Sequence, residues 1–402
     1  MPNVRDVFSG PWFSGPWRAV PVLGITQIIA WGAIFYSPVL TVPLIAAERG
    51  WSVSFTMGGF SLGLFVAGMA APQVGKWIDR YGGHLVMTAG SLIGALGLWG
   101  LAKVEHPAAY LAVWMVLGLG LSASLYDPAF ATLGRIFGTE ARRPITVLTL
   151  AGGFASTVGW PTTYYLIGAV GWQGCYLVYG ALLALVCAPL HAFALPRNRA
   201  IVGIRAEGTS VAPITVLPAQ GLTFVLVIAA FAAYAFVPSA LSAHLLAIFG
   251  RSGIDPATVV LIGTLFGPAQ VLARICELSF GRNVHPLIIA RAAVGLLVIA
   301  FGLLAVGGFS VPVAATFALM FGTANGLITI ARGAVPLALF GAVGYGRVIG
   351  RIAGPSLFMQ AAAPLVLAFV AEHVSDSIAL AFAATFAAIA LGCFLLIGRQ
   401  SN

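Results

Sequence analysis

Residues 53–103 read VSFTMGGFSLGLFVAGMAAPQVGKWIDRYGGHLVMTAGSLIGALGLWGLAK. Two apolar runs, 53–75 and 85–103, flank the short charged connection GKWIDRYGGH, which extends from Gly75 to His84. A helix rises about 1.5 Å per residue, so each run can cross a hydrocarbon core about 30 Å thick. Neither run alternates polar and apolar residues, as the strands of an outer-membrane barrel do. This stretch predicts two membrane-spanning helices joined by a tight turn.

The same pattern extends over the whole chain of 402 residues. Hydrophobic residues make up 60% of it, charged residues only 8%, and the mean hydropathy is +1.01. Soluble domains carry about 25% charged residues, so a water-soluble fold is excluded. We predict an all-α membrane protein with twelve transmembrane helices, at approximately 19–47, 53–75, 85–103, 108–134, 144–169, 173–195, 219–249, 256–280, 287–307, 311–333, 348–371 and 377–398.

Basic residues in the connections predict the orientation of these helices. With the N-terminus inside, 14 of them face the inner side: Arg5, Arg18, Lys76, Arg80, Arg135, Arg142, Arg143, Arg197, Arg199, Arg205, Arg282, Arg347, Arg351 and Arg399. Only Arg49, Lys103 and Arg251 face the outer side. Cytoplasmic loops are enriched in Lys and Arg, so we expect both termini in the cytoplasm of a bacterium and the chain in its inner membrane, without a cleaved signal peptide.

The net charge of +9 is explained by this topology, because the basic residues form no cluster and no nucleic-acid-binding motif is present. The four cysteines lie in or beside apolar runs without CxxC spacing, which favours packing over a metal site or a disulfide. We therefore expect no metal and no cofactor. The sequence has no nucleophile–base set and no nucleotide-binding loop, so we expect neither an enzyme nor a pump driven by ATP.

The polar connection 196–218 divides the chain into two halves of six predicted spans each. Short matches between the halves have offsets that agree to within one residue, as between Arg80 and Arg282 at +202 or between Phe137 and Phe340 at +203. Duplicated halves of this kind are common among transporters. We expect a cytoplasmic tail (1–18), an N-terminal six-helix bundle (19–195), a cytoplasmic linker (196–218), a C-terminal six-helix bundle (219–398) and a second cytoplasmic tail (399–402).

The connection from Gly75 to His84 resembles motif A of the major facilitator superfamily, G-x-x-x-D-R-x-G. Gly75, Asp79, Arg80 and Gly82 fit this motif, whereas Gly83-His84 departs from its usual basic pair. The resemblance implies the major facilitator fold, with two pseudo-symmetric six-helix bundles that alternate in access. We expect Asp79 to face a neighbouring helix N-terminus or an arginine.

Further charged residues are predicted to belong to the inner gate of such a transporter. Asp127 is expected to pair with Arg80, and the alternative role for Asp127 is to carry a coupling proton. The other residues predicted to gate or anchor the inner side are Arg135, Glu277 and Arg332.

Within the superfamily, the chain resembles the monocarboxylate and oxalate transporter branch. The similar segments are Gly50-Trp51-Ser52, RIFGTEARRPITVLTLAGG at 135–153, Gly159-Trp160-Pro161 and Gly171-Trp172. Gln173 stands where arginine is common in that branch, and the first span lacks the acidic residue and paired tryptophans of the animal carriers. Drug antiporters instead carry G-P-x-x-G-G in the fifth span, where this chain reads WPTTYY at 160–165.

Arg274 is the candidate substrate-binding residue. It precedes Arg282 by eight residues, about 12 Å along a helix, which places a costly charge inside the membrane. The branch has a substrate-binding arginine in this span, and a guanidinium fits a carboxylate with two hydrogen bonds. The alternative is a purely structural ion pair with Glu277 at i+3. Gln270 stands where the animal carriers have an aspartate, and a single central cation suits a monoanion.

We therefore predict a secondary transporter for a small organic anion, a monocarboxylate in the first instance, which acts as a monomer in the bilayer and is coupled to protons by symport. The alternative is an efflux carrier for drugs, toxic ions or metabolites. Tyr126 is a further candidate for an aromatic cavity wall. The predicted substrate-binding residues are Arg274, Gln270, Asn325, Trp31, Tyr36, Trp160, Tyr164 and Tyr234.

Overall fold

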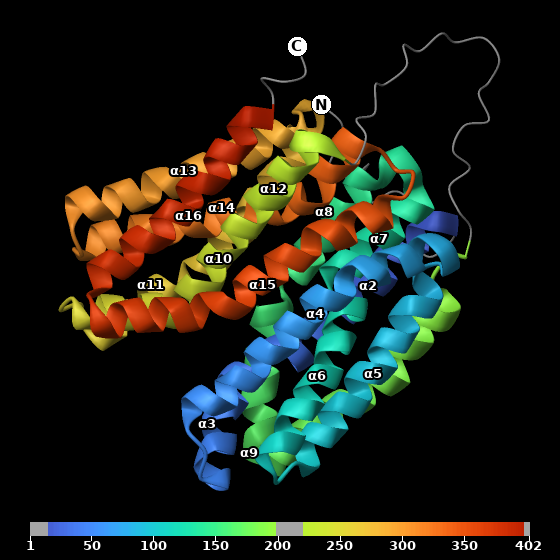
Figure 1. The fold of residues 1–402 in the computed structure, drawn as a ribbon, viewed down its shortest axis with the longest axis horizontal. Helices are drawn as coiled ribbons and strands as arrows, with labels where there is room; N and C mark the ends of the chain where they lie inside the picture. Colours follow the sequence, from blue (N-terminus) through green and yellow to red (C-terminus); the bar gives the residue numbers. More distant parts are fainter. Residues whose placement is uncertain (1–14, 198–219, 398–402) are drawn as a thin grey trace. The chain divides into compact units, whose positions relative to one another are not determined.

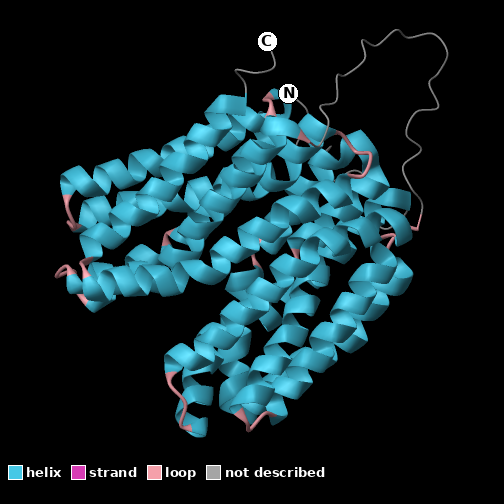
Figure 2. Ribbon diagram, in the orientation of Figure 1, coloured by secondary structure: helices cyan, strands magenta, loops and turns pink. Residues whose placement is uncertain are grey.

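The computed structural model of the protein describes residues 15–197 and 220–397. The expected N-terminal tail, central linker and C-terminal tail lie wholly or largely outside these ranges. Within them every regular element is a helix, and the connections are short (Figures 1 and 2). The prediction of an all-α membrane protein is confirmed.

The helices follow one another along the chain with few residues between them. The first part of the chain contains η1 (Gly15–Arg18), α2 (Ala19–Ala30), η2 (Trp31–Tyr36), α3 (Pro38–Arg49), α4 (Val53–Tyr81), α5 (Gly83–Lys103), α6 (Pro107–Ser124), α7 (Tyr126–Phe137), η3 (Gly138–Ala141), α8 (Arg142–Gly152), α9 (Ala155–Leu182), η4 (Leu183–Cys187) and η5 (Leu190–Ala194). The second part contains α10 (Gly221–Arg251), α11 (Pro256–Thr264), α12 (Phe266–Phe280), η6 (Gly281–Asn283), α13 (Pro286–Gly307), α14 (Val311–Phe340), α15 (Tyr345–His373) and α16 (Asp376–Leu396).

Ten stretches of the described residues are helical, long and apolar enough to cross a membrane. One of them, Pro107–Ala194, has 88 residues and is far too long for a single crossing. It is interrupted at Gly138 and Gly171, where φ is 59° and 73°. Only glycine adopts these values readily, so the chain can turn there. These two turns divide the stretch into three crossings, which is consistent with the twelve helices expected from the sequence.

By its contacts the chain divides into two compact units. Unit 1 takes its described residues from Met1–Thr41, Ala70–Gly221 and Gly333–Arg351. Unit 2 takes its described residues from Val42–Met69, Leu222–Arg332 and Ile352–Asn402. Each unit thus draws most of its residues from one half of the sequence. The assignment of 19–195 and 219–398 as two six-helix bundles stays a prediction.

The core of unit 1 is built from helices that lie far apart in the sequence. Leu23 of α2, Phe130 of α7, Ile145 of α8 and Tyr345 of α15 are all buried in one apolar cluster. The helix α5 also packs alongside both α6 and α9 (Figure 1). Dispersion between closely packed side chains, rather than water exclusion alone, holds such helices together in a membrane.

Unit 2 has a core rich in phenylalanine. Phe317 of α14 contacts Phe301 of α13 with ring centroids 5.3 Å apart, and Phe231 of α10 contacts Phe394 of α16 at 5.2 Å. Large apolar side chains also face outward, as Val306 does with 91% exposure. In a chain this apolar, such side chains are suited to contact lipid.

Candidate functional site

Asp79 joins the C-terminal turn of α4 to the first turn of α15. One of its carboxylate oxygens accepts a hydrogen bond from the backbone N–H of Gly346 at 2.9 Å, and the other from that of Arg347 at 2.8 Å. The first N–H groups of a helix have no partner within that helix, and the helix dipole favours an anion beside them. Asp79 therefore caps α15 from another helix, and both partners belong to unit 1.

Glycines allow α4 and α15 to come this close. A Cβ atom on Gly75 would overlap the backbone carbonyl of Gly346, and one on Gly350 would overlap the carbonyl of Ala71. On Gly346 itself, a Cβ atom would lie 2.6 Å from the Asp79 carboxylate. No larger residue fits at these positions while the two helices keep this distance.

Arg135 of α7 supports the same turn from another side. Its guanidinium donates to the backbone carbonyl of Ile78 at 3.0 Å and also to that of Asp79. These two carbonyls lie in the last turn of α4, and the chain then reverses at Gly82, which has a φ of 91°. A cation near the C-terminal carbonyls of a helix is favoured by the helix dipole.

Arg80 does not form the predicted pair with Asp127. The Arg80 side chain is exposed, and its guanidinium lies 5.1 Å from the centroid of the Tyr81 ring. Successive residues of a helix point about 100° apart, so Asp79 and Arg80 do not face the same neighbour. Arg135 of α7 is the arginine that contacts the last turn of α4, whereas Arg80 is itself part of that turn.

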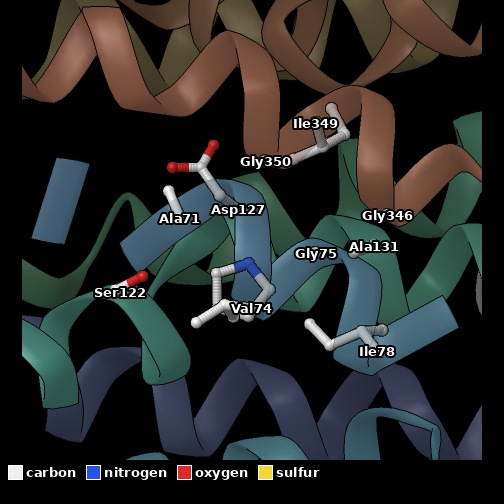
Figure 3. A pocket seen from close by; sticks show the side chains of 11 residues that line it. Ala71, Val74, Gly75, Ile78, Ser122, Asp127, Ala131, Gly346, Ile349 and Gly350 are labelled. Atoms are coloured by element: carbon white, nitrogen blue, oxygen red, sulfur yellow. The ribbon is translucent and has the colours of Figure 1, made fainter. Parts of the chain in front are cut away.

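Asp127 instead lines a small cavity together with Ser122, at the point where α4, the α6–α7 segment and α15 meet (Figure 3). The cavity measures about 10 Å³, which is room for about one water molecule. Its other walls are apolar or glycine: Ala71, Val74, Gly75, Ile78, Pro128, Ala131, Gly346, Ile349 and Gly350. This cavity is too small for a substrate.

Arg274 lies on α12 in unit 2 and is only 3% exposed. Glu277, one turn further along the same helix, is 6% exposed. Two charged residues are thus buried within one turn of a membrane-spanning helix. Burial of an ion is costly unless other groups replace its water shell, so this turn is either a binding site or a closed ion pair.

Two more of the predicted substrate-binding residues contact each other in the same unit as this arginine. The Tyr234 hydroxyl of α10 donates to Oδ1 of Asn325 on α14 at 3.0 Å. Gln270 lies one turn before Arg274, and its backbone packs on Gly326, where a Cβ atom would lie 2.6 Å from the Gln270 carbonyl. Arg332, near the end of the same α14, is half-buried.

The predicted aromatic residues of the first half form a cluster in unit 1. Trp31 contacts Tyr126 and Tyr36 with ring centroids 5.0 Å and 5.9 Å apart, and Tyr36 contacts Trp160 at 5.8 Å. Tyr164 lies apart from them, with its side chain 76% exposed and no ring contact to the other four among the described residues. Four of the five aromatic candidates of this unit are thus brought together.

Sequence reasoning missed Gly346 and Gly350, although their spacing of four residues is the small-xxx-small pattern of closely packed membrane helices. It also missed Gln27 of α2, which is fully buried and contacts the end of α6. A lone amide within the apolar first span was the signal, since a buried polar side chain needs hydrogen-bonding partners.

The profile of the Major Facilitator Superfamily matches residues 22–364, and the chain belongs to this superfamily. It is therefore a multi-pass membrane protein of a transporter superfamily and not an enzyme. Among solved structures, the human organic anion transporter MFSD10 (TETRAN) superposes with a TM-score of 0.71 at 18% identity, covering 94% of this chain and 99% of that one. The proton:xylose symporter XylE superposes with a TM-score of 0.72 at 10% identity, covering 96% of both chains.

Curated relatives named monocarboxylate transporters are similar to part of the chain. Human monocarboxylate transporter 2 is 33% identical over 132 residues, which is 32% of this chain and 27% of the relative. Mouse monocarboxylate transporter 11 is 28% identical over 148 residues, which is 36% of this chain and 32% of the relative. The chain thus spans about a quarter to a third of the length of these relatives.

Proposed function

We propose that this protein is a secondary transporter that moves a small organic anion, in the first instance a monocarboxylate, across a bacterial inner membrane. The observation that carries this proposal is Arg274, a guanidinium 3% exposed on a membrane-spanning helix. Such a charge usually faces a partner or a pathway. The similarity to transporters named for monocarboxylates and for organic anions supports the same class of substrate.

In this proposal Arg274 binds the carboxylate, and Gln270, Asn325 and Tyr234 shape its surroundings. The planar guanidinium donates two parallel hydrogen bonds to the two carboxylate oxygens. The Tyr234–Asn325 hydrogen bond holds these two side chains together. The proposed candidates of unit 1 for contact with an apolar part of the substrate are Trp31, Tyr36, Trp160 and Tyr164.

Transport by alternating access requires a gate that forms in one state and opens in the other. We assign the contact between Asp79 and the start of α15 to a closed inner side. With both termini in the cytoplasm, this contact lies at the cytoplasmic ends of the second and eleventh spans. Glu277 and Arg332 are proposed to anchor the inner ends of α12 and α14. Protons are the proposed coupling ion, and the proposed transporter acts as a monomer.

Uptake into liposomes tests this function. Purified protein is reconstituted and offered radiolabelled monocarboxylates of increasing size and, in parallel, cationic drugs, each with and without a pH gradient. We expect saturable carboxylate uptake that an inward-directed proton gradient accelerates. Drug transport without carboxylate transport would instead favour an efflux carrier. Carboxylate uptake at the same rate with and without a pH gradient would contradict the proposed coupling to protons. It would still support a carboxylate as the substrate.

A further inference from the structure

The helix of the fourth predicted span is interrupted at Leu125, between α6 and α7. Leu125 has a φ of −88° and a ψ of −154°, far from helical values. Four residues after Ser124 comes Pro128, which has no backbone N–H and so cannot donate to the Ser124 carbonyl as a helical residue would. Ser124 is fully buried, and its carbonyl therefore needs a donor from elsewhere.

Gln27 of α2 supplies that donor. Its side-chain Nε2 donates to the Ser124 carbonyl at 2.7 Å, and Gln27 itself is 0% exposed. Its other amide atom, Oε1, accepts a hydrogen bond from the indole Nε1 of Trp31 at 3.1 Å. One buried amide thus joins the interruption of the fourth span to an aromatic ring of the first span, and all three residues belong to unit 1.

The ring that Gln27 holds is the centre of the aromatic cluster. Trp31 packs at 5.0 Å on Tyr126, the first residue of α7 after the interruption, and at 5.9 Å on Tyr36. Tyr126 in turn stacks on Phe130 at 5.3 Å, and Gly152 leaves room for its hydroxyl. Because the indole is hydrogen-bonded to Gln27 and its ring also contacts Tyr126, its orientation is fixed by two neighbours.

We propose that Gln27 is a positioning residue that fixes the indole of Trp31 against the interruption of the fourth span and thereby sets selectivity for the apolar body of the substrate. The inference rests on the proposed function, because it assigns the aromatic cluster to substrate contact. It further names the substrate class: a carboxylate with a flat apolar or aromatic body gains from an ordered aromatic surface, whereas a two-carbon acid has no body to bind there.

The first test measures transport in liposomes with benzoate and acetate as the two probes. Gln27→Met keeps the length of the side chain and removes both hydrogen bonds. We expect its KM for benzoate to rise about tenfold, as the loss of an ordered contact implies, while its KM for acetate stays within about twofold of wild type. Gln73→Met, the same change at an exposed glutamine of α4, is the matched control and should alter neither KM.

Trp31→Phe is the second variant, because it removes the indole N–H and keeps the hydrogen bond from Gln27 to Ser124. It should raise the KM for benzoate as Gln27→Met does, and the double variant should be no worse than the poorer single one. Equal loss for benzoate and acetate, or additive effects of the two changes, would overturn the positioning role. A purely structural Gln27 would lower the amount of folded protein without changing the ratio of the two KM values.

Hydrogen exchange of the full chain in nanodiscs separates this inference from the proposed function. Backbone amides of 121–131 should exchange faster in Gln27→Met than in wild type, and should not change in Gln73→Met. If wild-type protein carries neither acid, the proposed function fails, and the exchange data still decide whether Gln27 holds the interruption. Unchanged exchange in Gln27→Met would show that it does not.

Discussion

At the scale of single residues, Arg274 is the main reason to propose an anionic substrate. The residue is buried together with Glu277 one helical turn away, and the hydrogen-bonded side chains of Tyr234 and Asn325 belong to the same unit. A site for a carboxylate uses hydrogen-bonding groups of this kind to fix orientation, whereas an arginine that only neutralises a glutamate does not need them. The surroundings of Arg274 therefore favour contact with a ligand.

Arg274→Lys should strongly weaken transport although the positive charge stays. Lysine keeps a point charge but loses the planar pair of donors that matches a carboxylate. A charged hydrogen bond contributes about 1.5–3 kcal/mol, so we expect a loss of affinity of about ten- to a hundredfold in uptake assays. Arg291→Lys is the matched control: Arg291 Nε donates to the Phe394 carbonyl at 3.0 Å, so that change should affect stability more than substrate affinity.

A double variant separates the two roles of Arg274. If the arginine only neutralises Glu277, then Arg274→Gln combined with Glu277→Gln removes both charges together and should restore folding and transport. If Arg274 binds the substrate, the double variant should fold and remain inactive. Normal anion uptake by a well-expressed double variant would take Arg274 out of the substrate site, and with it the main reason to regard the substrate as an anion.

At the scale of helices, the contact between α4 and α15 carries the proposed gate. Asp79→Asn should slow the exchange between states more than it weakens substrate binding. The amide still offers one acceptor oxygen, but it loses the charge and the second acceptor that face the Gly346 and Arg347 N–H groups. Distance measurements between spin labels, made with and without substrate, give the populations of the states.

Asp255→Asn is the control for this change. Asp255 also caps a helix, accepting from the Thr258 N–H at 3.0 Å, and hydrogen bonds from Thr258 hold its pKa below the usual value. Asparagine caps a helix about as well as aspartate, so this variant should transport normally. A tenfold loss of substrate binding in Asp79→Asn with normal exchange would contradict the assignment of Asp79 to the gate.

Gly75→Ala should act on the same contact through size alone. The new Cβ atom would overlap the Gly346 carbonyl, so α4 and α15 must move apart and Asp79 must lose its two hydrogen bonds. We expect a shift of the populations away from the state in which α4 and α15 touch, seen as faster labelling of a cysteine placed at Ile349, which is buried at this contact. Gly58→Ala on the same helix has nothing within 4 Å of its Cβ atom and should leave labelling unchanged.

The positions of the helices and of the turn between α4 and α5 can be predicted from the sequence. The side chains that contact each helix cannot. Apolar runs, glycines and prolines define the spans, because every backbone group in a membrane must be bonded within its own element. Whether Asp127 meets Arg80 depends on the direction of side chains around two helices, and a sequence alone does not place them. Arg80 therefore does not form the expected pair with Asp127, whereas Arg135 contacts the last turn of α4. Gln27 was missed because its importance comes from Pro128, a hundred residues away.

At the scale of the whole molecule, the distribution of basic residues predicts the topology. The predicted inner connections hold 14 Lys and Arg residues against three in the outer ones. Moving a short basic loop across the membrane is strongly disfavoured during insertion, so a difference of this size predicts that both termini lie in the cytoplasm. In that orientation the Asp79–α15 contact is expected on the cytoplasmic side, which is the side that the proposed gate must close.

Labelling from one side of the membrane tests this orientation. Single cysteines replace Lys103 and Glu140, which are both exposed and lie at opposite ends of the α6–α7 segment. Cys276 is exposed and Cys393 partly so, and both are first changed to serine, whereas Cys175 and Cys187 are buried and can stay. An impermeant maleimide should label Lys103→Cys in intact cells and Glu140→Cys only in inverted vesicles. Labelling of both residues from one side would contradict the predicted topology. It would also contradict the assignment of the Asp79–α15 contact to the cytoplasmic side.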